Sequence, residues 1–298
     1  MREPSTEIAN KQIRLVTNVG MVGNIVLSVL KVFVGTMAGS MSLIADGIHS
    51  LSDVATDLVV LLGIHLGSRQ PDESHPYGHG RLETLSAVIV GSVLAIVGAA
   101  MIYRGGMDIA AGKVVKANDF VLLVASISIV AKELLYRMSK KVAIKWHSPV
   151  LYANAWHHRS DAFSSVAVVV GFVSLRLGFV YGDQIAAVAV GLMIVLVAIR
   201  IVGDCVRELT EGAIDSETVA HIKQIVNSNN QIRQWHKLRT RMVGREVFVD
   251  LHILVDPELN VAAAHDIAED LEKAMEGEIT RPVNIIIHVE PDIPALRR

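Results

Sequence analysis

The chain has 298 residues, of which 51% are hydrophobic and only 19% charged, and its mean hydropathy is +0.43. A soluble domain needs a more charged surface and a disordered chain a lower apolar content, so both classes are excluded. The net charge of −2 argues against a nucleic-acid-binding protein, which normally carries a basic excess. The single cysteine, Cys205, excludes an internal disulfide framework and any multi-cysteine metal site.

Apolar stretches dominate the chain up to about residue 206 and predict a helical membrane domain. Thr84–Tyr103 is an uncharged run of 20 residues, which is long enough to cross the hydrocarbon core as a helix. The stretch Phe120–Tyr136 is interrupted by Lys132 and Glu133, and two other stretches carry histidine and aspartate. The pattern predicts six transmembrane helices, near residues 12–35, 42–67, 82–104, 118–137, 150–176 and 184–206.

The distribution of lysine and arginine predicts the orientation of these helices. With the N-terminus inside, the inner segments carry nine of these residues and the outer loops carry four. We therefore expect both termini in the cytoplasm and a multi-pass protein of the cell (inner) membrane.

After residue 211 the pattern becomes that of a small soluble domain, so we divide the chain into a transmembrane domain, 1–211, and a cytoplasmic domain, 212–298. Ser216–Ser228 is predicted as an amphipathic helix capped by its serine, and Ala262–Met275 as a second helix. Val247–Val255 alternates as a strand does, and Asn284–Val289 and His236–Met242 are further strand candidates. The order αββαβ predicts an α+β domain with an antiparallel sheet covered by two helices.

Two pairs of ionisable residues lie within predicted membrane helices, where such residues are functional candidates by default. His49 and Asp53 are four residues apart and share one helix face, and His157 and Asp161 repeat this spacing. Two imidazoles and two carboxylates form a set suited to a tetrahedral divalent ion, with Zn²⁺ as the natural occupant. In the alternative interpretation, each histidine pairs with its own aspartate to lower the cost of burial.

Two other clusters contain residues that bind metals. Asp72, His75 and His79 lie in the turn-rich loop PDESHPYGHGRLE, where solvated histidines are the alternative. In the soluble domain, His252 and His288 lie on separate predicted strands, and Glu290 shares a strand face with His288. His236 and His265 complete this cluster of the soluble domain. Its five residues are sufficient for one zinc site, or for two zinc sites that share a carboxylate.

At these residues the sequence resembles the cation diffusion facilitator family of membrane antiporters, which export divalent metal ions in exchange for protons. The resemblance is carried by four stretches of the chain: SLIADGIHSLSDVATD, HPYGHGRLE, ANAWHHRSDAFSS, and the tail with WHKLRTR, VDLHILVD and IIIHVE. It implies six transmembrane helices, a metallochaperone-like αββαβ cytoplasmic domain and a homodimer. By position it assigns three sites, namely an intramembrane transport site (His49, Asp53, His157, Asp161), a loop site (Asp72, His75, His79) and a binuclear cytoplasmic site (His236, His252, His265, His288, Glu290).

The resemblance therefore implies a transporter rather than an enzyme, with metal ions, protons, the lipid bilayer and a second copy of the chain as partners. Histidine at position 49 resembles the zinc-transporting branch, so Zn²⁺ is the expected cargo, with Cd²⁺, Fe²⁺ and Co²⁺ as alternatives. The position of Glu290 is often aspartate in the family. Three rival functions are an intramembrane zinc hydrolase, a proton channel or sensor, and a magnetosome-like iron transporter. None of the 12 histidines is followed by glutamate, which counts against the hydrolase.

Overall fold

The computed structural model of the chain describes residues 4–37, 41–112, 119–179, 181–279 and 281–297. The side chains at 4–6, 35, 41–49, 52, 119–121, 168, 172, 175 and 183 are outside this description. The chain divides into two compact units, an N-terminal unit, Met1–Val206, and a C-terminal unit, Arg207–Arg298.

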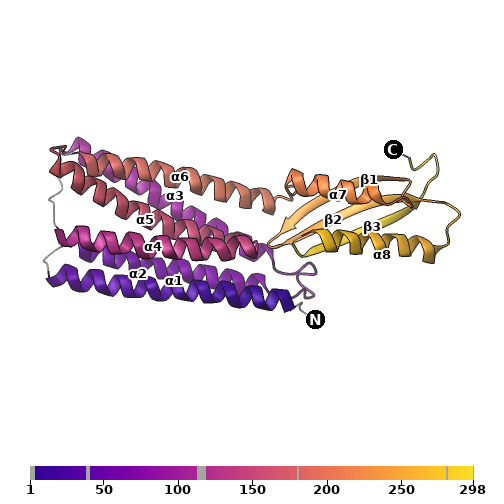
Figure 1. Ribbon diagram of the computed structural model, residues 1–298, viewed down its shortest axis with the longest axis horizontal. Helices are drawn as coiled ribbons and strands as arrows, with labels where there is room; N and C mark the ends of the chain where they lie inside the picture. The colour runs from indigo at the N-terminus through magenta and orange to yellow at the C-terminus, as the bar shows by residue number, and fades with distance from the viewer. Residues whose placement is uncertain (1–3, 38–40, 113–118, 180, 280, 298) are drawn as a thin grey trace. The chain divides into compact units, whose positions relative to one another are not determined.

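The N-terminal unit is built from long helices that run side by side (Figure 1). The six predicted helices are confirmed, and each helix end lies within eight residues of its predicted position. Helix α1 packs against α2, α4 against α5, and α3 against both α2 and α5. The bounds are α1 Pro4–Met37, α2 Met41–Gly67, α3 Arg81–Ala110, α4 Asp119–Lys145, α5 Pro149–Arg176 and α6 Gly182–Leu209.

Within the described residues, three helices are by themselves long and apolar enough to cross a membrane, over Glu7–Val34, Arg81–Ala110 and Gln184–Leu209. Helices α2, α4 and α5 carry the ionisable residues that lower the hydropathy of their stretches. In α2, Asp53 is buried while Leu62 is 58% exposed, and in α4, Lys132 is buried while Leu134 is 57% exposed. A helix bundle in a lipid bilayer requires this arrangement, with polar side chains in its interior and apolar side chains on its surface.

The C-terminal unit contains helix α7 (Ser216–Ser228), strands β1 (Gln234–Val243) and β2 (Glu246–Val255), helix α8 (Val261–Glu278) and strand β3 (Val283–Pro291). The αββαβ prediction is confirmed. The N-cap of α7 is Asp215 rather than the predicted Ser216, because the Asp215 side chain accepts a hydrogen bond from the Thr218 backbone N–H.

The three strands form one sheet in the order β1-β2-β3, in which only the first pair is antiparallel. Strand β3 runs parallel to β2, so the prediction of a wholly antiparallel sheet is wrong. The reason is the connection, because α8 carries the chain back to the starting end of β2 and so permits a parallel strand.

One face of the sheet forms the core of the C-terminal unit with the two helices. Val249, Leu251 and Ile253 of β2 are at most 1% exposed, and they belong to one apolar cluster with Ile222 of α7 and Leu271 of α8. Because successive side chains of a strand point to opposite faces, His252 of β2 lies on the face away from this cluster.

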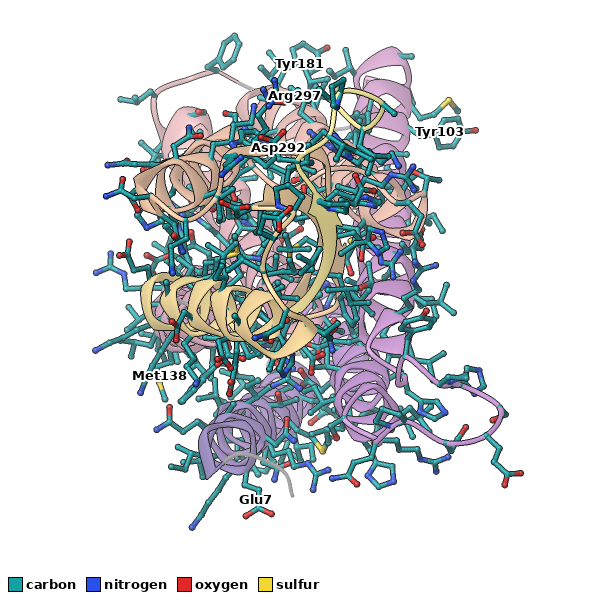
Figure 2. The ribbon with its side chains drawn as sticks, turned by 90° about the vertical axis from the view of Figure 1, so that its right-hand side faces the viewer. Glu7, Tyr103, Met138, Tyr181, Asp292 and Arg297 are labelled. Carbon is teal, nitrogen blue, oxygen red and sulfur yellow. The ribbon has the colours of Figure 1, made fainter. Side chains whose placement is uncertain are left out.

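The last strand is followed by an ion-pair group that predicts a specific acid dependence. Asp292 accepts hydrogen bonds from the Nε and Nη2 atoms of Arg297 at 2.7 and 2.9 Å, and it lies 3.6 Å from the guanidinium of Arg233 (Figure 2 labels Asp292 and Arg297). The hydrogen bonds from Arg297 hold the pKa of the Asp292 carboxyl below its usual value of 3.8.

We expect Asp292→Asn to lower the free energy of unfolding of residues 207–298 at pH 7. A lowered carboxyl pKa stabilises the fold above the unfolded-state value, and this stabilisation is lost as the pH falls through the folded-state value. The difference from the unsubstituted unit should therefore shrink below pH 3.8. Urea unfolding at pH 7 and pH 3 measures this difference in unfolding free energy. The control is Asp266→Asn, at an exposed site on α8. An equal difference at both pH values would contradict this role of the Asp292 carboxylate.

Candidate metal sites

The first candidate site lies inside the N-terminal unit, between α2 and α5. Asp53, His157 and Asp161 each offer a ligand atom, and these atoms lie within 4.8 Å of one another. Asp53 is 3% exposed and His157 is 2% exposed, and the His157 Nε2 atom lies 3.3 Å from an Asp53 oxygen. Among the described residues, neither ring nitrogen of His157 has a hydrogen-bond partner, as is suitable for a ligand. The side chain of His49 lies outside the described residues.

A lysine that was not predicted as a site residue joins this group. The Nζ atom of Lys132, in α4, donates hydrogen bonds to Asp53 Oδ2 at 2.9 Å and to Asp161 Oδ2 at 2.6 Å. Lys132 is 1% exposed, so its ammonium is buried with the two carboxylates. Since α2 and α5 each contribute one carboxylate, this single ammonium links three helices.

A second buried polar group lies one helical turn away, around Asp57. Its two oxygens accept hydrogen bonds from the side-chain amides of Asn24 and Asn154, each at 2.9 Å. The Nε2 atom of His158 is 3.9 Å from the same carboxylate. His158 therefore contacts Asp57 and not Asp53, in agreement with its position on a different helix face from His157.

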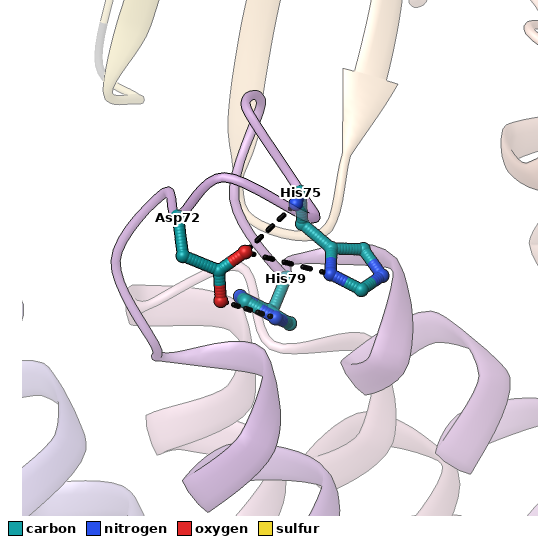
Figure 3. A group of neighbouring side chains, drawn as sticks. All are labelled: Asp72, His75 and His79. Carbon is teal, nitrogen blue, oxygen red and sulfur yellow. Dashed lines mark hydrogen bonds and ion pairs between the residues drawn. The ribbon is translucent and has the colours of Figure 1, made fainter.

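The second candidate site is the loop between α2 and α3, where Asp72, His75 and His79 converge (Figure 3). The Asp72 carboxylate lies 3.7 Å from His75 Nδ1 and 3.4 Å from His79 Nε2, and the two imidazole rings are 4.4 Å apart. His79 is 7% exposed, whereas Asp72 and His75 are exposed.

Hydrogen bonds within this loop determine the position and charge of Asp72. Its Oδ1 atom accepts hydrogen bonds from the Ser74 hydroxyl, the Ser74 N–H and the His75 N–H at 2.6, 2.9 and 2.8 Å. The Ser74 hydroxyl is the main cause that lowers the pKa of Asp72 to about 2. The carboxylate of Asp72 is thus charged at every physiological pH.

The third candidate site lies on the sheet of the C-terminal unit. In the strand register, His236 of β1 pairs with His252 of β2, which pairs with His288 of β3, so three histidines form a row across the sheet. Glu290 Oε1 lies 2.8 Å from His252 Nδ1, and Glu290 Oε2 lies 3.2 Å from His236 Nε2. The hydrogen bond with His252 is the main cause that lowers the pKa of Glu290 below 4.5.

The five predicted residues of this unit are not equally close. His236, His252 and Glu290 bring ligand atoms within 4.8 Å of one another. His288 is beside them, with Nε2 3.5 Å from Glu290, but its side chain is 61% exposed. His265 is exposed on α8 and, among the described residues, does not belong to the group of His236, His252 and Glu290.

Residues 18–210 match the family "Cation efflux transmembrane domain", and residues 214–292 match "Cation efflux protein, cytoplasmic domain". The chain belongs to the cation diffusion facilitator family. The first match contains the membrane and loop groups, and the second contains the histidine row of the sheet.

Several members of the family are similar to the chain over most of its length. An uncharacterized transporter of Methanocaldococcus jannaschii is 38% identical over 86% of this chain and 91% of its own. The magnetosome protein MamB of Magnetospirillum gryphiswaldense is 32% identical over 90% of both chains. The manganese efflux system protein MneP of Bacillus subtilis is 31% identical over 93% of this chain and 96% of its own.

Membership establishes this chain as a divalent metal cation efflux transporter embedded in the membrane, in a family of transporters rather than enzymes. The sequence motifs predict this family, but they do not point to Lys132 or to the amides around Asp57. The signal for Lys132 was present, because a lysine in an apolar helix needs a buried partner as much as an aspartate does.

Proposed function

We propose that this chain exports Zn²⁺ in exchange for protons by alternating access, through a site formed by His49, Asp53, His157 and Asp161. The observation that carries the proposal is the buried convergence of Asp53, His157 and Asp161 from two helices. Buried carboxylates and an imidazole inside a membrane domain are costly unless they bind something. A divalent cation satisfies all three at once.

Proton exchange follows from the chemistry of these donors. Carboxylates and imidazoles bind metal only in their deprotonated forms, so metal and protons compete for the same atoms. Exposure to the cytoplasm favours metal binding, and exposure to a more acidic exterior favours release and protonation. We place both termini in the cytoplasm, as the distribution of lysine and arginine indicates, and we assign the protein to the cell (inner) membrane.

Manganese is the second candidate cargo, because a relative 31% identical over most of the chain is named a manganese efflux system protein. The donor types favour zinc, since imidazole suits Zn²⁺, whereas Mn²⁺ prefers oxygen ligands. Metal tolerance tests the function in cells that lack their own exporters. Producing the protein should lower cellular zinc and raise the zinc concentration that stops growth. Protection against manganese alone would replace zinc by manganese as the cargo, and protection against neither metal would contradict the proposal.

We assign metal sensing and homodimer formation to the C-terminal unit. The match to a cytoplasmic dimerisation domain of this family supports the dimer. Zinc bound by His236, His252 and Glu290 would neutralise clustered charge on the sheet and strengthen the association of two protomers. The loop group of Asp72, His75 and His79 is proposed as a third zinc site.

The histidine row makes a separate prediction. We expect His252→Ala to weaken zinc binding to residues 207–298 by about tenfold or more, since His252 contacts Glu290 in the centre of the row. Calorimetric titration measures the affinity. The matched control is His221→Ala, because His221 lies on α7 in the same unit and pairs with Glu278 at 2.7 Å. Equal losses in both variants, or none in His252→Ala, would count against a site on the sheet.

A further inference from the structure

Lys132 is a buried cation at a place where the proposed function puts another cation. Its side chain is the largest among the fully buried ones of the described residues, at 1% exposure. A buried ammonium is costly unless it is paired and hydrogen-bonded. Lys132 of α4 meets this requirement through two aspartates of neighbouring helices. Its Nζ atom lies 2.9 Å from Asp53 Oδ2 and 2.6 Å from Asp161 Oδ2.

Both partners of Lys132 are proposed metal ligands. Asp53 comes from α2 and Asp161 from α5, and their ligand atoms converge with His157 within 4.8 Å. A zinc ion bonds carboxylate oxygens at about 2.0–2.2 Å, so an ion bound here would use the same two carboxylates whose Oδ2 atoms accept hydrogen bonds from Nζ. The ammonium and the metal therefore compete for one pair of carboxylates, and their like charges repel each other.

We propose that Lys132 is a tethered counter-cation of the transport site, which binds the two carboxylates when metal does not and which an incoming divalent ion must displace. The inference rests on the proposed function and adds to it the residue that limits how tightly the metal is held. A divalent ion can displace the ammonium because it carries twice the charge of the ammonium next to the same two carboxylates, whereas a monovalent ion has no such advantage.

Lys132 also affects the step in which the metal-free transporter changes the exposure of its site from one side of the membrane to the other. Two carboxylates alone would repel each other and would strongly disfavour a buried position. With Lys132 between them, the group carries less net charge, and α2, α4 and α5 remain linked. Lys132 is thus a positioning residue that favours metal release and allows the site to change its exposure between the two sides.

The test compares Lys132→Met with the unsubstituted full-length protein in lipid vesicles. Methionine keeps a long side chain without the charge. We expect zinc to bind at least about tenfold more tightly, because a repelling charge next to the ion is removed. The initial rate of zinc flux should fall about tenfold or more, because release becomes slower. The matched control is Lys140→Met on the same helix, where the Nζ atom contacts the Tyr136 hydroxyl at 3.0 Å.

A purely structural lysine gives a different result. In that case Lys132→Met would lower the melting temperature with and without zinc and would weaken zinc binding, which overturns the proposal. We expect instead a lower melting temperature without zinc and a larger zinc-dependent increase than in the unsubstituted protein. Unchanged affinity and flux would also overturn it.

Two further measurements separate the remaining outcomes. If Lys132→Met does not yield folded protein, Lys132→Gln retains hydrogen-bond donors without the charge, and the same larger zinc-dependent increase in melting temperature is expected. Its absence overturns the proposal. Lys132→Arg keeps the charge and should bind zinc no more tightly than the unsubstituted protein. If the unsubstituted protein itself moves no divalent metal, the proposed function fails rather than the role of Lys132.

Discussion

Replacing Asp161 by alanine is expected to reduce metal flux by about 100-fold or more, to the background of vesicles without protein. Loss of a group that only supports a metal ligand costs about 10- to 100-fold in metal affinity or activity. Loss of the ligand itself should therefore cost about 100-fold or more. The protein should still fold, because Lys132 retains its hydrogen bond to Asp53 at 2.9 Å.

Zinc flux into vesicles measures the effect, and size-exclusion chromatography with a melting curve verifies the fold. Asp204→Ala is the matched control, since Asp204 is an exposed aspartate of α6, another membrane helix. Zinc flux that persists in Asp161→Ala would remove Asp161 from the ligand set.

The second large effect is expected in the choice of metal. His157→Asp replaces the imidazole beside Asp53 by a third carboxylate in the described group. Oxygen donors suit Mn²⁺, and imidazole suits Zn²⁺, so the ratio of zinc to manganese flux should fall by about tenfold or more. His157 is buried, so water cannot replace its side chain as a ligand. The donor atom at position 157 should therefore determine which metal the site prefers.

Competition between the two metals for uptake measures this ratio directly. His65→Asp is the control, because His65 is an exposed histidine of α2 whose Nδ1 atom lies 3.3 Å from an Arg14 guanidinium nitrogen. An unchanged ratio in His157→Asp would mean that His157 does not select the metal. A chain that already favours manganese would identify Mn²⁺ as the cargo.

The helices were predictable because their signals are local. Apolar length locates α3 and α6, and the charges in α2, α4 and α5 interrupt that signal without abolishing it. The sheet was predictable only in part, because the alternation in β2 does not tell which way β3 runs beside it. The parallel pairing follows from the path of α8, which is a long-range feature.

The candidate sites divide in the same way. The spacing of His157 and Asp161 gives a shared helix face from sequence alone. By contrast, Lys132 is 79 residues from Asp53 and 29 from Asp161, so only the packing of three helices reveals its role. The row of His236, His252 and His288 likewise depends on the strand register, which sequence spacing does not determine.

Coupled fluxes of zinc and protons test the central claim most directly. The purified protein is reconstituted into vesicles with a proton-sensitive dye inside and an imposed pH gradient, and both fluxes are recorded together. The account predicts zinc movement driven by the gradient, with protons moving in the opposite direction, and the loss of both fluxes in Asp161→Ala. Proton movement without metal, or zinc movement that ignores the pH gradient, would contradict exchange of metal for protons through this site.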